Sequence, residues 1–318
     1  MSHGEFAFIR DHLLPLTRGD RAALELSDDA ACLELSGNSL LASDMLVEGV
    51  HFLRSDGPAV AAQRAFGSNL SDLAAMGAIP RGFLCTVCWP TRYSTADREA
   101  FVDALGVVAA AENLALLGGD MTRADAPLTI SLTMIGETTS DPLRRNGAKP
   151  GDQLFVSGTI GDAVLGLSIA KGELDKQDFL LERYQRPQAR IELGQTLLNK
   201  ATACIDISDG LAADAQHLAR ESGVGLEIEG ALIPWSAPVL HWLENEGRAG
   251  VETLITGGDD YELLFTAPVE HAASILALKR TLGVDVTWIG QVVEGEGVRI
   301  QDEMGVPLDI ETSGFTHF

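Results

Sequence analysis

The residues best able to do chemistry are aspartates in six short acidic segments. Each segment places an aspartate beside glycine, serine or another aspartate, at an expected strand end or in an expected glycine turn. The segments are Asp28-Asp29, Ser43-Asp44, Ser71-Asp72, Gly118-Gly119-Asp120, Asp206-Ile207-Ser208-Asp209 and Gly257-Gly258-Asp259-Asp260. A single aspartate of this kind is usually a helix cap or a turn residue. Six of them at element ends, where sites are commonly built, indicate a shared acidic site.

Carboxylates that converge need positive charge. Two like charges ~4 Å apart repel by about 1 kcal/mol in water and by more near a protein surface, so they take up protons or bind cations. Oxygen donors without clustered histidine or cysteine select hard cations such as Mg²⁺. Several Mg²⁺ ions would let such a site accept a polyphosphate, and the glycine pairs would let backbone N–H groups approach phosphates closely.

The overall charge excludes two classes of partner. The 318 residues include 23 Lys and Arg against 46 Asp and Glu, a formal net charge of −23. Nucleic acid and anionic membranes both require a positive surface. No apolar run approaches the ~18 residues of a membrane span, and no signal-peptide pattern is visible. We therefore predict a cytoplasmic protein without nucleic-acid or membrane partners.

Familiar catalytic motifs are absent from the sequence. There is no G-x-x-x-x-G-K-[ST] loop, no H-R-D or D-F-G motif and no G-x-S-x-G elbow, so an ATP site would need another fold. Cys85 and Cys88 form a C-x-x-C inside an apolar run that is typical of a strand. Residues three apart on a strand point to opposite faces, and no second pair completes a zinc site. Both are predicted to be buried core thiols.

Hydrophobic periodicity predicts alternating helices and strands in both halves of the chain. The first half is expected to contain strands at 30–35, 39–43, 83–89 and 128–137, and helices at 58–76 and from Ser94, with its Asp97 cap, to 113. The second half is expected to contain strands at 153–157, 204–207, 226–228 and 261–265, terminal strands, and helices at 162–171, 190–200, 211–222, 239–246 and 271–282.

Turn residues between 138 and 151 mark the best domain boundary. We predict domains at residues 1–138 and 151–318. An internal similarity supports two related halves: Asn69-Leu70-Ser71-Asp72-Leu73-Ala74-Ala75 and Asp206-Ile207-Ser208-Asp209-Gly210-Leu211-Ala212-Ala213 each place Ser-Asp beside a small-residue helix.

Several longer strings resemble the thiamine-monophosphate kinase family of the aminoimidazole-ribonucleotide-synthetase-like superfamily. The resemblance extends from about Glu5 to Phe318. Its most specific strings are Val47-Glu48-Gly49-Val50-His51-Phe52 and Gly257-Gly258-Asp259-Asp260-Tyr261-Glu262-Leu263-Leu264-Phe265; shorter ones include Arg145 to Asp152 and the acidic segments above.

The resemblance implies a two-domain α/β (α+β) protein with ATP between the domains. Strands of the N-terminal domain would pair two chains into a homodimer. The implied reaction converts ATP and thiamine monophosphate into ADP and thiamine diphosphate.

The resemblance also implies roles for individual residues. Mg²⁺ ligands would be Asp28, Ser43, Asp44, Asp72, Asp120, Asp206 and Asp209. ATP would contact Gly119, Asp120, Arg145 and Ser208, and the thiamine substrate would contact His51, Glu262 and Phe315. Asp44, Asp120, Arg145 and Asp209 would carry the catalysis. No role follows for Asp29, Asp259 or Asp260, and Glu48 and Lys149 are interpreted as structural.

Two positions depart from the family pattern. Ser27 stands where the family has glycine before the Asp pair, which would alter the turn more than the metal site. Phe315 stands where related chains often carry Trp or Tyr, and it offers weaker cation–π attraction than Trp.

The chemistry of the acceptor predicts the mechanism. A phosphomonoester has a second pKa near ~6, so its oxygens are ionised at neutral pH and need no general base. Mg²⁺ and Arg145 would screen the repulsion between two anions, which predicts direct in-line transfer.

Two alternatives stay open. One is another ATP-dependent synthetase of the same superfamily, acting on selenide or a purine precursor; a selenide enzyme would carry a reactive cysteine nearer the N-terminus than Cys32. The other is a nucleotide-sensing protein without catalysis, which would have lost some of the acidic segments.

Overall fold

The computed structural model describes residues 5–28, 30–302 and 304–308. The chain divides into two compact units: unit 1 contains residues up to Leu73 and Ile79–Ser140, and unit 2 contains Ala74–Ala78 and the residues from Asp141 onward. Among the described residues, no helix combines the length and apolar character needed to cross a membrane.

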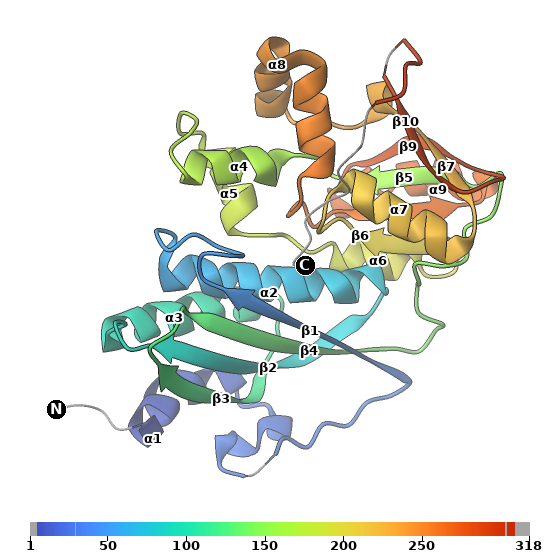
Figure 1. Cartoon of the computed structure of the whole chain (residues 1–318). Helices are drawn as coiled ribbons and strands as arrows, with labels where there is room; N and C mark the ends of the chain where they lie inside the picture. Colours follow the sequence, from blue (N-terminus) through green and yellow to red (C-terminus); the bar gives the residue numbers. More distant parts are fainter. Residues whose placement is uncertain (1–4, 29, 303, 309–318) are drawn as a thin grey trace. The chain divides into compact units, whose positions relative to one another are not determined.

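Unit 1 is built on a four-stranded sheet of order β1-β4-β2-β3 (Figure 1). Its strands are β1 (Asn38–Val47), β2 (Ile79–Pro90), β3 (Leu116–Ala124) and β4 (Thr129–Thr138). β4 pairs antiparallel with β1 and β2, and β2 pairs parallel with β3. The unit begins with the short helices α1 (Glu5–Phe8), η1 (Ile9–Leu13), η2 (Leu14–Thr17) and η3 (Arg21–Leu26).

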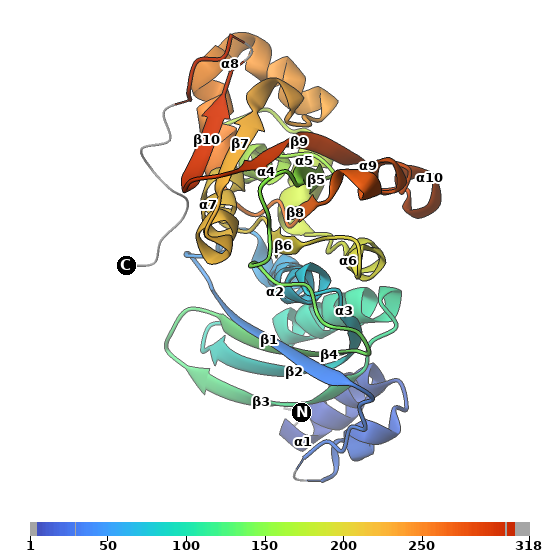
Figure 2. The ribbon, with the colours of Figure 1, turned by 90° about the vertical axis from the view of Figure 1, so that its right-hand side faces the viewer.

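Two long helices cover one face of this sheet, as Figure 2 shows for α2 (Gly57–Ala75) and α3 (Thr95–Ala111). Edge-to-face ring pairs join Phe66 of α2 to Phe83 of β2 and Phe101 of α3 to Trp89 of β2. Beneath the helices the predicted apolar stripe is completely buried; it consists of Leu128, just before β4, and Ile130, Leu132 and Met134 of β4. A capping box of Ser94 and Asp97 starts α3 as predicted.

Two predictions for unit 1 are wrong. Residues 31–36 form no strand; instead Ala31 and Leu33 pack as side chains on Ala22, Ala23, Ala115 and Leu117. The segment Gly118-Gly119-Asp120 is not a turn but lies inside β3, where Gly119 pairs with Cys85 of β2. In both places the conformation depends on a neighbouring strand or core, which the local pattern of residue types does not reveal.

Cys85 and Cys88 are half-buried, which corrects the prediction that both are buried core thiols. Cys85 pairs with the buried Leu132 and Cys88 with Thr129, so they do point to opposite faces of the sheet. Burial raises the pKa of the Cys85 thiol to about 12, so it is no thiolate ligand or nucleophile at neutral pH.

Unit 2 contains a six-stranded sheet of order β10-β7-β9-β5-β8-β6. Its strands are β5 (Gln153–Ser157), β6 (Ala203–Asp206), β7 (Gly225–Glu229), β8 (Leu263–Ala267), β9 (Val286–Val293) and β10 (Gly297–Gln301). Its helices are α4 (Asp162–Ala170), α5 (Asp178–Gln185), α6 (Ile191–Leu197), α7 (Leu211–Ser222), η4 (Gly230–Leu232), α8 (Ala237–Thr256), α9 (Val269–Leu276) and α10 (Lys279–Leu282).

Both faces of this second sheet are buried. Leu154 and Val156 of β5 share one apolar cluster with Leu211 and Leu218 of α7. Phe155, between them in sequence, belongs to a second cluster, with Leu193 of α6 and Ile275 of α9. Alternate side chains of a strand point to opposite faces, so helices cover the sheet on both sides. The aspartates of unit 2 lie in the segment that follows β6 and in the segment that precedes β8, so strands of this buried sheet position them.

Candidate active site

Asp44 lies in the middle of β1 on the face covered by α2. Its backbone N–H donates to Oδ1 of Asn69 at 2.9 Å, and the Asn69 amide donates to the Ala65 carbonyl of the same helix. Asp72 is three residues further along α2 and therefore lies on the same side of the helix as Asn69. Burial raises the pKa of the Asp44 carboxyl, with His51 acting in the opposite direction. A bound cation would offset this raised pKa.

Ser43 and Asp120 lie on the other face of the same sheet. Asp44 is in register with Leu132, Cys85 and Gly119 across the four strands, whereas Asp120 is in register with Thr86, Ser131 and Met45. Asp120 is exposed, and its Oδ1 accepts the N–H of Met121 at 2.9 Å. The Ser43 hydroxyl contacts the Leu132 carbonyl and the Thr133 hydroxyl.

One chain therefore does not bring Asp44 and Asp120 to a shared ion. β1 and β3 are the two edges of the sheet, separated by two strands. With strands about 4.8 Å apart, their backbones are roughly 14 Å apart, and the side chains point to opposite faces. Two carboxylates that share a Mg²⁺ must each place an oxygen about 2.1 Å from it.

Gly119 makes the closest backbone approach of unit 1. A Cβ built on Gly119 would lie 1.8 Å from the Cys85 carbonyl oxygen in β2, whereas one on the adjacent Gly118 would meet only Leu84 Cδ2, at 3.5 Å. This approach explains why glycine is needed at 119 whether or not a phosphate binds there.

We expect Gly119→Ala to destabilise the protein by about 1–3 kcal/mol or more, because the strands must separate to admit the methyl group. Gly118→Ala is the matched control and should change stability by less than about 1 kcal/mol. Urea unfolding of both variants checks this; equal midpoints would contradict the close approach.

His51 is held in the turn that follows β1. Its Nδ1 accepts the N–H of Val47 at 3.0 Å, so the neutral ring carries its proton on Nε2. The guanidinium of Arg64 donates to the His51 carbonyl at 3.0 Å. Glu48 of the same turn is buried; it accepts the N–H of Leu128 and pairs with Arg92. The contacts of Glu48 are therefore those of a residue that stabilises the turn. The bond from Val47 fixes the tautomer of His51.

The aspartates of unit 2 lie where β6 meets α7. Asp206 ends β6, and Ser208, Asp209 and Gly210 form the connection to α7. Oδ2 of Asp214, one turn into α7, accepts the N–H groups of Ser208, Asp209 and Gly210 at 3.0, 3.0 and 3.2 Å. Burial, together with the charges of Asp206 and Asp209, raises the pKa of Asp214 to about 8. Asp214 is not among the predicted site residues, because it lies inside a helix and not at the end of an element.

The Gly257-Gly258-Asp259-Asp260 segment packs on this connection. The N–H of Asp259 donates to the Ser208 carbonyl and that of Tyr261 to the Ile207 carbonyl, at 2.9 and 2.8 Å. The Tyr261 hydroxyl donates to Asp259. Asp260 points inward: it is 1% exposed, and both its oxygens accept the N–H of Gly161, the N-cap of α4. Burial raises the pKa of Asp260.

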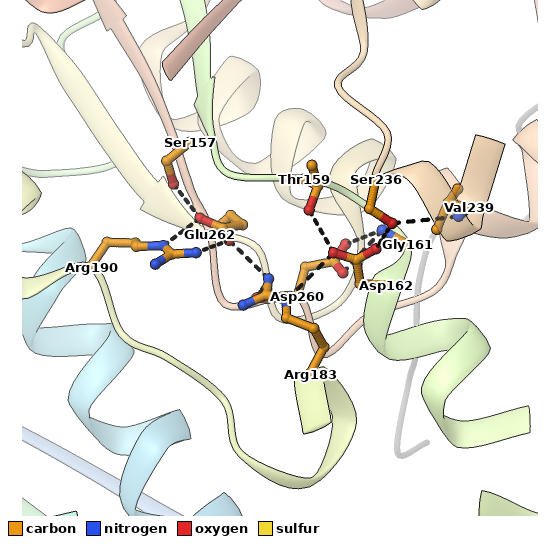
Figure 3. A network of polar contacts seen from close by, with 10 residues as sticks. All are labelled: Ser157, Thr159, Gly161, Asp162, Arg183, Arg190, Ser236, Val239, Asp260 and Glu262. Carbon is orange, nitrogen blue, oxygen red and sulfur yellow. Dashed lines mark hydrogen bonds and ion pairs between the residues drawn. The ribbon is translucent and has the colours of Figure 1, made fainter. Parts of the chain in front are cut away.

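Glu262 is the centre of a buried ionic network (Figure 3). Its carboxylate accepts from Arg183 at 2.8 Å, from Arg190 Nε at 2.7 Å and from the Ser157 hydroxyl at 2.6 Å. Burial alone would raise the pKa of Glu262, but Arg190 and Arg183 and the Ser157 bond outweigh it, so the pKa lies below its usual value. The Glu262 side chain is completely buried.

Arg183 extends this network to α4 and α8. Its guanidinium lies 3.5 Å from Oδ2 of Asp162, whose carboxylate also accepts from the hydroxyls of Thr159 and Ser236, both at 2.5 Å. The network therefore connects the start of α4, helix α5 and the start of α8 (Figure 3).

Among the described residues of unit 2, two cavities bear on the site. The larger, about 620 Å³, is lined by residues of β7, β9 and β10 and by none of the predicted site residues. The smaller, about 140 Å³, is lined among others by Thr159, Phe179, Arg186, Arg183 and Arg190. Since Arg183 and Arg190 hold Glu262, the smaller cavity adjoins the network and is the better candidate for a ligand, despite its size.

For the remaining predicted residues the structure gives little evidence of a shared site. Arg145 is exposed, and its carbonyl accepts the hydroxyl of Ser222. Asp28 is exposed on the segment after η3. Asp29 and Phe315 lie outside the described residues.

The donors of both units fit a hard cation. In unit 1 the half-buried Asp44 offers a carboxylate whose raised pKa a cation would relieve. In unit 2, Asp209, Asp214 and His217 offer ligand atoms within 4.8 Å of one another. Carboxylate oxygens suit Mg²⁺ better than an imidazole does, so the carboxylates of that group fit the ion and His217 does not.

Comparison with known proteins places this geometry in a family. Residues 27–138 match AIR synthase related protein, N-terminal domain, and residues 149–303 match AIR synthase related protein, C-terminal domain. The thiamine-monophosphate kinase of Caulobacter vibrioides is 41% identical over 300 residues, which cover 92% of this chain and 85% of the relative.

Solved structures of thiamine-monophosphate kinases show the same similarity over nearly the whole chain. The crystal structure of thiamine-monophosphate kinase from Stenotrophomonas maltophilia K279a has a TM-score of 0.85 at 34% identity, covering 96% of this chain and 98% of that chain. AaThiL complexed with AMPPCP and TMP has a TM-score of 0.78 at 35% identity, covering 99% and 97%. The two-domain α/β chain therefore belongs to the AIR synthase related family and, within it, to the thiamine-monophosphate kinases.

Proposed function

We propose that this protein phosphorylates thiamine monophosphate with ATP, releasing ADP and thiamine diphosphate. The observation that carries the proposal is full-length similarity to thiamine-monophosphate kinases, one such structure being complexed with AMPPCP, an ATP analogue, and TMP. The retained acidic segments at Asp44, Asp72, Asp206 and Asp209 support catalysis over a purely sensing role. The family matches over residues 27–138 and 149–303 support the proposed domains, 1–138 and 151–318. The two compact units divide after Ser140 but assign Ala74–Ala78 to the second unit.

The proposed metal ligands are the acidic residues expected from the sequence. The best supported are Asp44, whose N–H bonds to Asn69 of α2, Asp72, three residues after Asn69, and Asp206 and Asp209, which end β6 and follow it. Asp28, Ser43 and Asp120 complete the proposed set. Bound Mg²⁺ would neutralise the phosphates and stabilise charge on the transferred group.

The protein's own groups would bind and align the two anions. A phosphate oxygen of thiamine monophosphate is the nucleophile and is already ionised at neutral pH, so no residue need act as a base. Arg145 and the Ser208 hydroxyl would orient the ATP phosphates for in-line transfer. The Nε2–H of His51 can donate to the substrate, because Nδ1 already accepts from Val47.

Contact between Glu262 and the thiamine moiety, together with Phe315, stays part of this proposal. In the structure Glu262 is engaged by Arg183, Arg190 and Ser157. It would therefore act on the substrate either after releasing a partner or by holding Arg190 at the small cavity that both arginines line.

A second copy of the chain would complete the site. Asp44 and Asp120 lie at opposite edges and on opposite faces of the unit 1 sheet, so they serve one reaction only if another chain supplies the missing half. The sheet face away from α2 and α3 exposes large apolar side chains: Leu41 is 68% exposed and Met45 58%. Such a face is typical of an interface, and it supports the homodimer.

We expect the double variant Leu41→Glu/Met45→Glu to raise the dimer dissociation constant ~100-fold or more, about 2.7 kcal/mol, because charge is buried at the interface. Turnover should fall with dimerisation. Light scattering after size exclusion measures this, with Val107→Glu, which changes an exposed residue of α3, as control. A double variant that remains dimeric and active would refute this face as the interface.

A coupled measurement of ADP and thiamine diphosphate tests the activity itself. Purified protein is incubated with ATP, Mg²⁺ and thiamine monophosphate, and both products are quantified by chromatography. Equimolar products establish the kinase. ADP without thiamine diphosphate would indicate another acceptor, and no ADP would favour a nucleotide-sensing protein.

A further inference from the structure

Asp214 has an unusual set of partners for a residue inside a helix. One oxygen, Oδ2, accepts three consecutive backbone N–H groups, those of Ser208, Asp209 and Gly210. The Asp214 side chain is buried, with only 2% of the residue exposed. A buried N–H without an acceptor costs about 1–3 kcal/mol, so this carboxylate satisfies three donors that the connection would otherwise leave unpaired.

The opposite side of the same connection is also held. The carbonyls of Ile207 and Ser208 accept N–H groups of Tyr261 and Asp259. A Cβ on Gly258 would lie 2.1 Å from the Ser208 carbonyl oxygen, and one on Gly210 would lie 2.8 Å from the Gly257 carbonyl oxygen. Residues 207–210 are thus fixed between the 257–261 segment, which binds their carbonyls, and Asp214, which binds their N–H groups.

We propose that Asp214 is a positioning residue that sets the orientation of Asp209 and Ser208 for metal and nucleotide. This inference rests on the proposed function of those two residues. Because their N–H groups are committed to Asp214, the parts of the connection that face a ligand are side chains: the carboxylate of Asp209 and the hydroxyl of Ser208. Asp214 acts through them and does not touch the reacting groups.

A direct ligand role for Asp214 is the competing explanation, since its carboxylate lies within 4.8 Å of ligand atoms of Asp209 and His217. The three N–H bonds occupy Oδ2 and leave only Oδ1 for a metal, so the bonds that the structure shows are those of a positioning residue. The two roles differ in what asparagine can replace. The Asn carbonyl can accept the same N–H bonds, whereas it is a much poorer Mg²⁺ ligand than a carboxylate.

The test compares Asp214→Asn, Asp214→Ala and the remote control Glu137→Ala in the full chain. Glu137 is a buried carboxylate of unit 1 that accepts the N–H of Ser36 and pairs with Arg81. Its loss should lower the unfolding midpoint without altering metal binding. Mn²⁺ binding in the presence of a non-hydrolysable ATP analogue is titrated by electron paramagnetic resonance, and kcat and the half-saturating Mg²⁺ concentration are measured in parallel.

Removing a residue that orients metal ligands typically weakens metal affinity about 10- to 100-fold. We expect that loss for Asp214→Ala, with a similar increase in half-saturating Mg²⁺, and a change within ~3-fold for Asp214→Asn, since its weaker neutral bonds are retained. Equal losses in both variants would assign Asp214 as a ligand and overturn the positioning role. If Asp214→Ala does not fold, the Asp214→Asn result alone decides.

The titration also separates this inference from the proposed function. Wild-type Mn²⁺ binding needs no thiamine turnover, so a protein that binds Mn²⁺ but fails to phosphorylate thiamine monophosphate still tests Asp214. Unchanged binding in a folded Asp214→Ala variant overturns only the inference. Absence of Mn²⁺ binding in the wild type overturns the metal site and the inference with it.

Discussion

Replacing Asp44 with alanine is expected to lower kcat by about 100- to 1,000-fold while the protein remains folded. Electrostatic groups aimed at developing charge contribute on this scale, and Asp44 is the proposed metal ligand with the clearest placement. Its backbone N–H, not its carboxylate, makes the bond to Asn69, so the side chain can be removed without losing that contact. Burial already raises the pKa of this carboxyl, and its removal should not destabilise the fold.

The matched control is Asp103→Ala, which removes an exposed carboxylate from α3. The free energy of unfolding of both variants should lie within about 1 kcal/mol of the wild-type value. Only Asp44→Ala should lose turnover. Steady-state kinetics over a range of Mg²⁺ concentrations and urea unfolding provide the two readouts. A kcat for Asp44→Ala near that of the wild type would remove Asp44 from the proposed metal site.

Glu262→Ala is expected to destabilise the protein by about 3–5 kcal/mol, the typical cost of removing one member of a buried ion pair. The reason is the network of Figure 3: Arg183 and Arg190 would lose their shared carboxylate while their own side chains stay only 8% and 16% exposed. Ser157 would lose its acceptor as well. Chemical unfolding measures the loss.

Glu182→Ala supplies the comparison, because Glu182 lies in α5 next to Arg183, a partner of Glu262. Glu182 pairs with Arg186 at 3.7 Å, with both side chains about half exposed, and such pairs contribute about 0–1 kcal/mol. If Glu262→Ala unfolds like Glu182→Ala but shows a much higher KM for thiamine monophosphate, Glu262 would be a substrate residue without a structural function. A large loss of stability with an unchanged KM in the folded fraction would instead assign Glu262 a structural function and no contact with the substrate.

The network also predicts how stability depends on pH. The pKa of Glu262 is lower in the folded protein than its ordinary value of 4.5. A carboxyl of this kind contributes stability that is fully present above the unfolded pKa and lost as the pH falls through the folded one. As the pH is lowered from neutral to below 4.5, the free energy of unfolding of the wild type should therefore fall more than that of Glu262→Ala. Parallel curves would show that Glu262 is not ionised in the network.

The sequence by itself predicted the elements with strong local signals. The apolar stripe of β4, the Ser94 cap of α3 and the bounds of α7 follow from periodicity and capping, which depend on residues a few positions apart. The acidic segments and the long sequence motifs around His51 and Glu262 could also be recognised in the sequence, because each is contiguous in the chain. They led to the family that the full-length comparisons support.

Local signals failed where distant residues decide the conformation. Ala31 and Leu33 alternate like a strand, yet they cover a core made by Ala22, Ala115 and Leu117. Helix α5 was not predicted, since its buried residues are Leu180, Arg183 and Tyr184, and a buried arginine breaks the apolar period. Its burial depends on Glu262, which is 79 residues away.

Only the tertiary structure decided which candidate residues can act together. Strand order put Asp44 and Asp120 on opposite edges and faces of one sheet, a relation that no spacing in the chain encodes. Folding also turned Asp260 and Glu262 inward and assigned Asp214 to three N–H groups of the Asp209 connection. The sequence determines which groups exist and in what local conformation, whereas hydrogen-bond pairing and burial across the fold determine what each group can reach.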